Sequence, residues 1–245
     1  MIKNSDMIFG IRAVAEAISA GKEVDKILIR KDLSGELATE LFGLIKGTDI
    51  TVQRVPQEKL NSITRKNHQG VIAFISPIHY QPVEEIIASL YEQGRVPFFL
   101  VLDHLTDVRN FGAIARTAEC AGVDAIIIPS KGSVSVTADA VKTSAGALMN
   151  IPVCRVASLY NTVKYLKASG LQVVGASEKS TKDYTEADMT LPLALVMGAE
   201  DKGISTEILS LVDTSVSLPQ YGKIASLNVS VAAGVMIYEV LRQRR

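Results

Sequence analysis

The segment from Leu191 to Glu239 holds the glycines, carboxylates and amides whose spacing best suits chemistry. One apolar run ends at Met197 and is followed by Gly198 and Gly203, and a second apolar run ends at Leu218. Each run reads as a short strand that ends in a polar loop. In a mostly parallel α/β sheet such loops lie together at the carboxyl ends of the strands, where ligands bind. We therefore expect a ligand-binding site in this segment.

Two charged residues, Arg116 and Glu200, are candidates for this site, but each has an ordinary structural alternative. Arg116 could be a solvated position on a helix, and Glu200 could be a loop carboxylate that caps a nearby helix. Asn110 and Asn228 could likewise be helix-start residues, and Ser226 could be the N-cap of the last helix. Residue type and spacing alone leave both interpretations open.

The turn from Gly198 to Gly203 has the spacing of a phosphate-binding loop but lacks its functional side chains. Ile204 and Ser205 stand where a lysine and a hydroxyl residue are required, and no Gly-x-Gly-x-x-Gly sequence follows a strand. Both facts disfavour an enzyme that uses a nucleoside triphosphate or NAD. No cluster of His, Asp or Glu has the spacing of metal ligands, so we expect no bound metal. We interpret His104 as part of a loop surface.

The composition of the 245-residue chain is typical of a globular protein with one large domain or two small ones. Its 26 basic and 26 acidic residues give no net charge, so any RNA binding would have to come from local patches. No apolar run approaches the roughly 20 residues of a membrane span. No signal-peptide core follows the first residues, which favours the cytoplasm. We interpret Cys120 and Cys154 as buried small hydrophobic residues.

Apolar spacing and turn residues predict a small α/β unit in the first part of the chain. Helical periodicity and helix-ending glycines indicate three helices, and short apolar runs indicate three strands. These elements are the helices 10–20, 34–46 and 56–63 and the strands 26–30, 50–55 and 69–75. Proline and polar residues interrupt the pattern over residues 76–82, and we place a domain boundary there.

Strands and helices alternate through the second part of the chain, which predicts parallel crossovers and a three-layer α/β domain. The strand 96–103 is strongly apolar, as expected when both faces of a sheet are covered. The basic tail Arg242–Arg245 suits the negative end of the last helix. The predicted helices are 83–93, 110–121, 138–149, 159–168 and 226–242, and the other predicted strands are 124–129, 151–156, 171–176, 191–197 and the short strand that ends at Leu218.

Three sequence blocks, taken together, resemble the three motifs of the SpoU (TrmH-type) RNA ribose 2'-O-methyltransferases of the SPOUT superfamily. They agree with the family in order and spacing, and they are Asp103–Gly122 for motif 1, Leu195–Gly203 for motif 2 and Leu218–Ala233 for motif 3. The segment Ile8–Ala17 resembles the substrate-binding domain of the subfamily that methylates a guanosine of 23S ribosomal RNA. The resemblance covers nearly the whole chain and is weakest in the linker.

The resemblance implies a three-layer, parallel-sheet methyltransferase domain with a C-terminal trefoil knot, in a homodimer. A small α/β domain like those of ribosomal proteins would precede it and bind RNA. The predicted domains are therefore 1–76 for RNA substrate binding, 77–95 for a linker and first helix, and 96–245 for methyl transfer. Val108 stands where the family often has proline, and Gln220 where it often has methionine. Neither departure removes a charged or amide group, so they loosen the subfamily assignment more than the activity.

The activity that the resemblance implies is 2'-O-methylation of a ribose, in a guanosine of large-subunit ribosomal RNA, with S-adenosylmethionine as the methyl donor. The residues implied to bind the donor are Met197, Gly198, Gly203, Leu218 and Leu227. The residues implied to surround the reacting ribose are Asn110, Arg116, Glu200, Ser226 and Asn228. Basic residues of the first domain could contact RNA phosphates, or could be ordinary surface charge: Arg12, Arg30, Lys31, Arg65 and Lys66, with His68 and Gln69 nearby.

Arg116 is expected to position the substrate rather than to remove a proton, because a guanidinium is a costly proton acceptor. Its planar fork suits the phosphate beside the target ribose. Two alternative functions stay open at this point: a transfer-RNA 2'-O-methyltransferase, and a non-catalytic RNA-binding assembly factor with the same fold.

Overall fold

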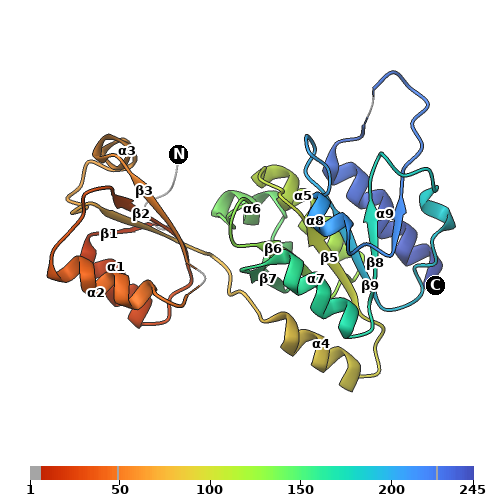
Figure 1. Cartoon of the computed structure of the whole chain (residues 1–245), viewed down its shortest axis with the longest axis horizontal. Coiled ribbons are helices and arrows are strands. Elements are labelled where there is room, and N and C mark those ends of the chain that lie inside the picture. Colours follow the sequence, from red (N-terminus) through yellow and green to blue (C-terminus); the bar gives the residue numbers. More distant parts are fainter. Residues whose placement is uncertain (1–6, 49, 225) are drawn as a thin grey trace. The chain divides into compact units, whose positions relative to one another are not determined.

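The computed structural model describes residues 7–48, 50–224 and 226–245 (Figure 1). The start of the predicted RNA-binding domain, residues 1–6, lies outside this described part. The chain divides into two compact units, and the main division falls between His79 and Tyr80. Each unit has its own sheet and its own buried core. No described helix is both long and apolar enough to cross a membrane.

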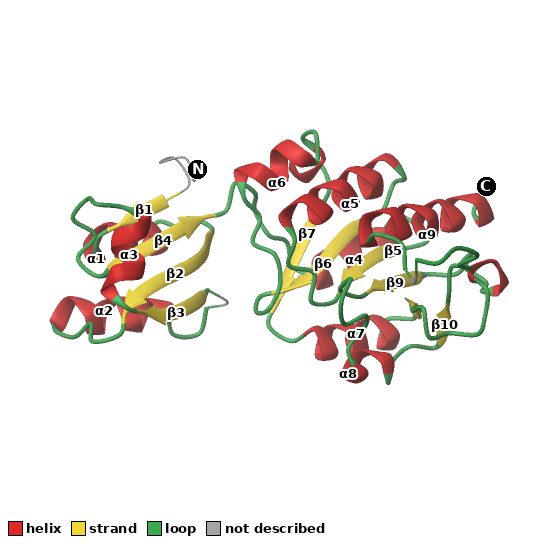
Figure 2. Cartoon of the chain, turned by 90° about the horizontal axis from the view of Figure 1, so that it is seen from above, coloured by secondary structure: helices red, strands yellow, loops and turns green. Residues whose placement is uncertain are grey.

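The first unit is a four-stranded sheet with helices on both faces (Figure 2). Its elements are β1 (Met7–Phe9), α1 (Ile11–Ser19), β2 (Val24–Arg30), α2 (Glu36–Ile45), β3 (Thr51–Val55), α3 (Gln57–Ile63) and β4 (Val71–Ile75). The strand order is β1-β4-β2-β3, with β3 parallel to β2 and with β4 antiparallel to both β1 and β2. Val14 of α1 and Leu41 of α2 are buried against one face, and Leu60 of α3 is buried against the other.

The second unit is a six-stranded sheet whose paired strands are all parallel. Its strands are β5 (Phe98–Leu102), β6 (Ala125–Pro129), β7 (Val153–Val156), β8 (Gln172–Ala176), β9 (Leu193–Met197) and β10 (Thr214–Val216), in the spatial order β10-β8-β9-β5-β6-β7. Its helices are α4 (Val83–Glu92), α5 (Val108–Cys120), α6 (Ala138–Thr143), α7 (Leu159–Ala168), α8 (Thr206–Leu209) and α9 (Val229–Gln243).

Three layers form because the central strands are apolar on both faces. Every residue of β5 and of β9 is buried, as expected for parallel strands covered on both sides. Helices α4, α7 and α8 share one core with the sheet, and α5 packs beside α9 on the opposite face (Figure 2). The strand order brings the carboxyl ends of β5, β9, β8 and β10 side by side, and ligands bind at such edges.

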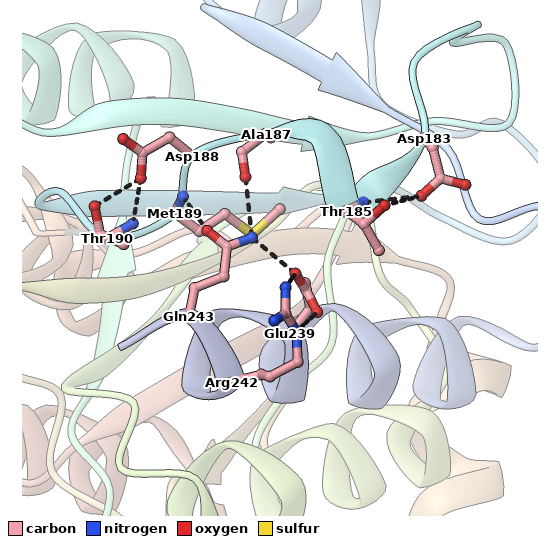
Figure 3. Close-up of polar contacts among 9 residues, drawn as sticks. All are labelled: Asp183, Thr185, Ala187, Asp188, Met189, Thr190, Glu239, Arg242 and Gln243. Atoms are coloured by element: carbon pink, nitrogen blue, oxygen red, sulfur yellow. Dashed lines mark hydrogen bonds and ion pairs between the residues drawn. The ribbon is translucent and has the colours of Figure 1, made fainter. Parts of the chain in front are cut away.

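A polar network around the buried Glu239 attaches the C-terminal helix α9 to the segment before β9 (Figure 3). Glu239 is buried and accepts hydrogen bonds from Arg242 at 2.7 and 2.8 Å and from Gln243 at 2.7 Å. Gln243 also accepts from the Met189 amide at 2.8 Å and donates to the Ala187 carbonyl at 3.0 Å. The hydrogen bond from Arg242 lowers the pKa of Glu239 below its usual range.

Arg244 extends this attachment to the starts of β5 and β9. Its guanidinium donates to the carbonyl oxygens of Leu191 at 2.6 Å, Met189 at 3.0 Å, Val96 at 3.2 Å and Pro97 at 3.3 Å. The basic tail was expected to suit the helix dipole, and Arg242 does lie in the last turn of α9. Arg242 and Arg244 also bind specific partners. The end of α9 is thereby fixed to the two central strands.

The predicted α/β class, the parallel sheet and most elements are confirmed, and the differences have local causes. The predicted helix 138–149 ends early because Ala145 and Gly146 have positive φ angles of 52° and 88°, and a short 3₁₀ turn, Ala147–Met149, follows. Strand β1 and helix α8 were not predicted, since three and four residues are too short to show a period. Cys120 was expected to be buried and is exposed. Cys154 is buried, which raises the pKa of its thiol to about 12. The trefoil knot stays a prediction.

Candidate active site

A pocket lies at the carboxyl edge of the second sheet, where the loops after β8, β9 and β10 meet the start of α9. All five residues that were expected to bind the donor line it: Met197, Gly198, Gly203, Leu218 and Leu227. These residues come from two separate strand ends and one helix start. The sheet order explains their meeting, because β8 lies between β9 and β10.

Gly198 lies under the backbone of the loop that follows it. A Cβ atom at this position would lie 2.1 Å from the Gly203 carbonyl carbon and 2.2 Å from the Ile204 nitrogen. Ala199 and Gly203 exchange two backbone hydrogen bonds of 2.8 and 3.2 Å, which close the loop into a tight turn. No side chain fits between these two backbone segments, so this wall of the pocket requires glycine at position 198.

Asn110 and Asn228 meet beside the pocket and join the first turns of α5 and α9. The Asn228 side-chain amide donates to the Asn110 side-chain oxygen at 3.1 Å. Asn228 also caps α9, because its oxygen accepts from the Ser230 amide at 3.0 Å. The N-cap of α5 is Asp107, which accepts from the Asn110 amide at 2.7 Å. The side chain of Asn110 is therefore not needed as a cap, and it links the two helices instead.

The other three residues expected at the ribose differ in their placement. Glu200 and Ser226 are exposed and line the pocket. The capping alternative for Ser226 is wrong, because α9 starts at Val229 with Asn228 as its cap. Arg116 lies on α5, exposed, and its side chain has no hydrogen bond or ion pair with another described residue. Its guanidinium is thus available to a ligand, although Arg116 does not line the pocket itself.

The part of the pocket at the end of β8 was not predicted from the sequence. Ala176, Ser177 and Glu178 line it, and a Cβ atom on Gly203 would lie 3.8 Å from the Glu178 carboxylate. These residues belong to none of the three motif blocks. Only the knowledge that β8 lies next to β9 would have pointed to them, and strand order is not visible in the sequence.

The segments that carry the basic residues expected to bind RNA lie at the same end of the first sheet, where β1 and β2 end and β4 begins. Lys66 lies over the Phe9 ring at 5.6 Å, and Gln69, in the same loop, accepts from the Ile11 amide at 3.2 Å. Arg12 follows Ile11, and Arg65 precedes Lys66.

Residues at the end of β2 reach the same loop. The Arg30 amide donates to the Gly70 carbonyl at 2.8 Å, and Lys31 follows Arg30. Arg30 also forms an ion pair with Asp32 at 2.7 Å. His68 is not available to RNA, because it is 4% exposed and its ring bonds to Asn61 and to the Gly70 amide. Across the described ranges no group of His, Cys, Asp and Glu could hold a metal ion.

Comparison with known proteins gives matches over both units. The sequence model of the SpoU rRNA Methylase family matches residues 97–238, and a model described as RNA 2'-O ribose methyltransferase substrate binding matches residues 7–81.

Individual relatives match along almost the whole chain. A protein of Staphylococcus saprophyticus assigned to the TrmH family of tRNA/rRNA methyltransferases is 40% identical over 97% of this chain and 96% of its own length. A Bacillus subtilis protein with the same assignment, YacO, is 36% identical over 100% of this chain and 98% of its own. The crystal structure of the SpoU methyltransferase AviRb from Streptomyces viridochromogenes, in complex with AdoMet, has a TM-score of 0.61 and 26% identity, covering 97% of this chain and 90% of AviRb. The chain therefore belongs to the SpoU rRNA Methylase family of RNA methyltransferases.

Proposed function

We propose that the protein transfers a methyl group from S-adenosylmethionine to the 2'-hydroxyl of a guanosine ribose in large-subunit ribosomal RNA. One observation carries the proposal: loops from separate sequence blocks form one pocket, and the Asn110–Asn228 pair lies beside it. Membership of the family and the AdoMet complex of AviRb support the choice of donor.

The pocket suits this donor in shape and in charge. Gly198 and Gly203 both line the pocket and have no side chain, so a ligand can approach their backbone closely. Leu218 and Leu227 offer apolar contact for a purine ring. The carboxylate of Glu200 lines the same pocket, and its charge is opposite to that of a sulfonium and an ammonium group. When bound, S-adenosylmethionine supplies an electrophilic methyl group.

The residues of the chain then have to align a ribose hydroxyl and take its proton. Alignment alone contributes about 7–11 kcal/mol in favourable systems. Asn110 and Asn228 are held together by their hydrogen bond and present a fixed pair of amides. Glu200 and Ser226 orient the hydroxyl and relay its proton to solvent. Arg116 holds the phosphate next to the target ribose, which suits a guanidinium that is exposed and has no partner among the described residues.

Residues 1–76 select the RNA in this proposal, and residues 96–245 perform the transfer, with 77–95 as linker and first helix. Support comes from the loop before β4, which carries Arg65 and Lys66 and bonds through Gln69 to Ile11, the residue before Arg12. Phosphate contacts from such residues position RNA without reading its sequence. In this proposal, residues around the pocket that contact the reacting nucleotide select its base.

A homodimer is part of the proposal, because α9 has an apolar stripe on its outer face. Val231, Val235 and Tyr238 are 52%, 37% and 49% exposed, and their spacing places them on one side of the helix. Asn228 stands at the start of the same helix. A second copy of the chain that covers this stripe would remove it from water and would lie next to the Asn110–Asn228 pair.

Two other functions are separated by direct assays. A transfer-RNA methyltransferase would produce 2'-O-methylated nucleosides in transfer RNA and none in ribosomal RNA. Failure to bind S-adenosylmethionine would support an assembly factor without activity. An enzyme that uses a nucleoside triphosphate or NAD is disfavoured further, because the chain belongs to a methyltransferase family.

Arg116→Lys should lower turnover on ribosomal RNA by roughly 100-fold, because a lysine cannot hold a phosphate through two parallel hydrogen bonds. The affinity for S-adenosylmethionine should stay near that of the wild type, since Arg116 does not line the pocket. Single-turnover methylation and calorimetric titration measure the two effects. Arg245→Lys, at an exposed arginine outside the site, is the control. Unchanged turnover in Arg116→Lys would remove this residue from the mechanism.

Arg65→Ala/Lys66→Ala should weaken binding of ribosomal RNA on the order of tenfold and reduce the salt dependence by about two counterions. Filter binding at several salt concentrations measures both quantities, and mass spectrometry of digested RNA then reports 2'-O-methylguanosine. Lys22→Ala/Lys46→Ala is the matched control, because these lysines precede β2 and β3 and so lie at the opposite end of the strands. If the two double variants bind ribosomal RNA equally well, Arg65 and Lys66 do not contribute to RNA binding.

Val235→Glu should convert the protein from dimer to monomer at micromolar concentration, because a second copy would have to bury the new charge. Sedimentation equilibrium measures the mass. Val52→Glu, at a position on β3 that is 39% exposed, controls for adding a charge to a surface valine. A monomeric wild-type protein, or a dimer that persists in Val235→Glu, would rule out this interface.

A further inference from the structure

We propose that Asp103 is a positioning residue that holds the loop between β9 and α8 against Gly198 and thereby shapes the donor pocket. The inference rests on the proposed function and names a residue outside the set expected to bind the donor or the ribose. Asp103 directly follows β5 and is 1% exposed. Its amide donates to the Met197 carbonyl at 2.9 Å, which extends the pairing of β5 with β9 to the pocket edge.

Both carboxylate oxygens of Asp103 are engaged. One accepts from the Ser205 amide at 2.7 Å, across 102 residues of sequence. The other pairs with the His104 ring nitrogen at 2.5 Å. A buried carboxylate needs such partners, because burial without them is costly. The bond to Ser205 is therefore a fixed connection between the end of β5 and the start of α8.

This connection acts on the pocket through the backbone. Ser205 follows the Gly203–Ile204 peptide, the segment that would lie 2.1–2.4 Å from a Cβ atom on Gly198. Ile204 is 5% exposed and packs into the core, so the segment is held on both sides of this peptide. Gly198 and Gly203 both line the pocket. Loss of the Asp103 bond would let the peptide move away from Gly198 and open the wall.

His104 supplies a second sign that this corner is held under constraint. Its φ angle is +58°, a left-handed conformation that is unfavourable for a residue other than glycine. The ring, although half exposed, turns back to Asp103. The sequence had suggested only a loop-surface role for His104. In the structure its ring occupies the Asp103 oxygen that Ser205 does not use.

Two other aspartates make the same kind of bond away from the pocket. Asp124 accepts from the Phe98 amide at 2.8 Å, and Asp213 accepts from the Val173 amide at 2.8 Å. Both bonds lie near the N-terminal ends of strands, whereas the pocket lies at the C-terminal ends. Asp124 is thus a matched control: it stabilises the fold through a similar bond without contacting the pocket loops.

The test compares donor affinity with stability in the full-length protein. Asp103→Ala should raise the Kd for S-adenosylmethionine on the order of tenfold, with turnover at saturating donor within about threefold of the wild type. Asp103→Asn should stay within about threefold in Kd, because its amide oxygen still accepts the Ser205 N–H. Asp124→Ala should lower the Tm and leave this Kd unchanged. Hydrogen exchange of residues 198–205 should increase in Asp103→Ala and not in Asp124→Ala.

A second pair of variants approaches the same bond from its donor. Ser205 has a φ angle of −60°, which proline adopts, so Ser205→Pro removes the N–H. Ser205→Pro should bind the donor on the order of tenfold more weakly than Ser205→Ala, which keeps the N–H. Equal Kd values in Asp103→Ala and the wild type, or in the two Ser205 variants, would overturn the role of Asp103. The proposed donor pocket would not be affected by that result. A wild-type protein that binds no S-adenosylmethionine would overturn the donor pocket itself.

Discussion

The contact between Gly198 and the Gly203–Ile204 peptide is the constraint on which the rest of the site depends. Two backbone segments lie so close that even a methyl group at position 198 would overlap with them. The turn from Ala199 to Gly203 can close only because of this approach, and the closed turn forms one wall of the pocket. Asp103 holds the far end of the turn from the neighbouring strand. This wall of the candidate pocket is therefore built from backbone, and the Asp103 carboxylate bonds to the end of the segment that forms it.

The sheet order and the C-terminal helix bring the remaining groups to this wall. Because β9 lies between β5 and β8, the loops after three strands open at one edge, and α5 starts beside them. Helix α9 must begin at the same edge for Asn228 to meet Asn110. Its other end is fixed by Gln243, which bonds to Ala187 and Met189 before β9 (Figure 3). Arg244 adds bonds to the carbonyl oxygens just before β5 and β9.

The sequence allowed the class of fold and the pocket walls to be predicted, for identifiable reasons. The strands β5 and β9 are apolar throughout, and glycines mark the turn that follows β9. What local patterns do not contain is strand order, and this is why Glu178 was missed. The role of Asp103 was hidden for the same reason, because its partner Ser205 is 102 residues away. His68 looked like a possible RNA contact, but its burial depends on the fold around Asn61. The basic cluster at Lys66 was suggested by residue type, and the loop that gathers it became visible only in three dimensions.

A crystal structure of the protein with S-adenosylhomocysteine tests the central claim most directly. The account predicts density for the ligand between Gly198, Leu218 and Leu227, with the turn from Ala199 to Gly203 closed as it is here. Density at another place on the chain, or an empty pocket at saturating ligand concentration, would contradict the account.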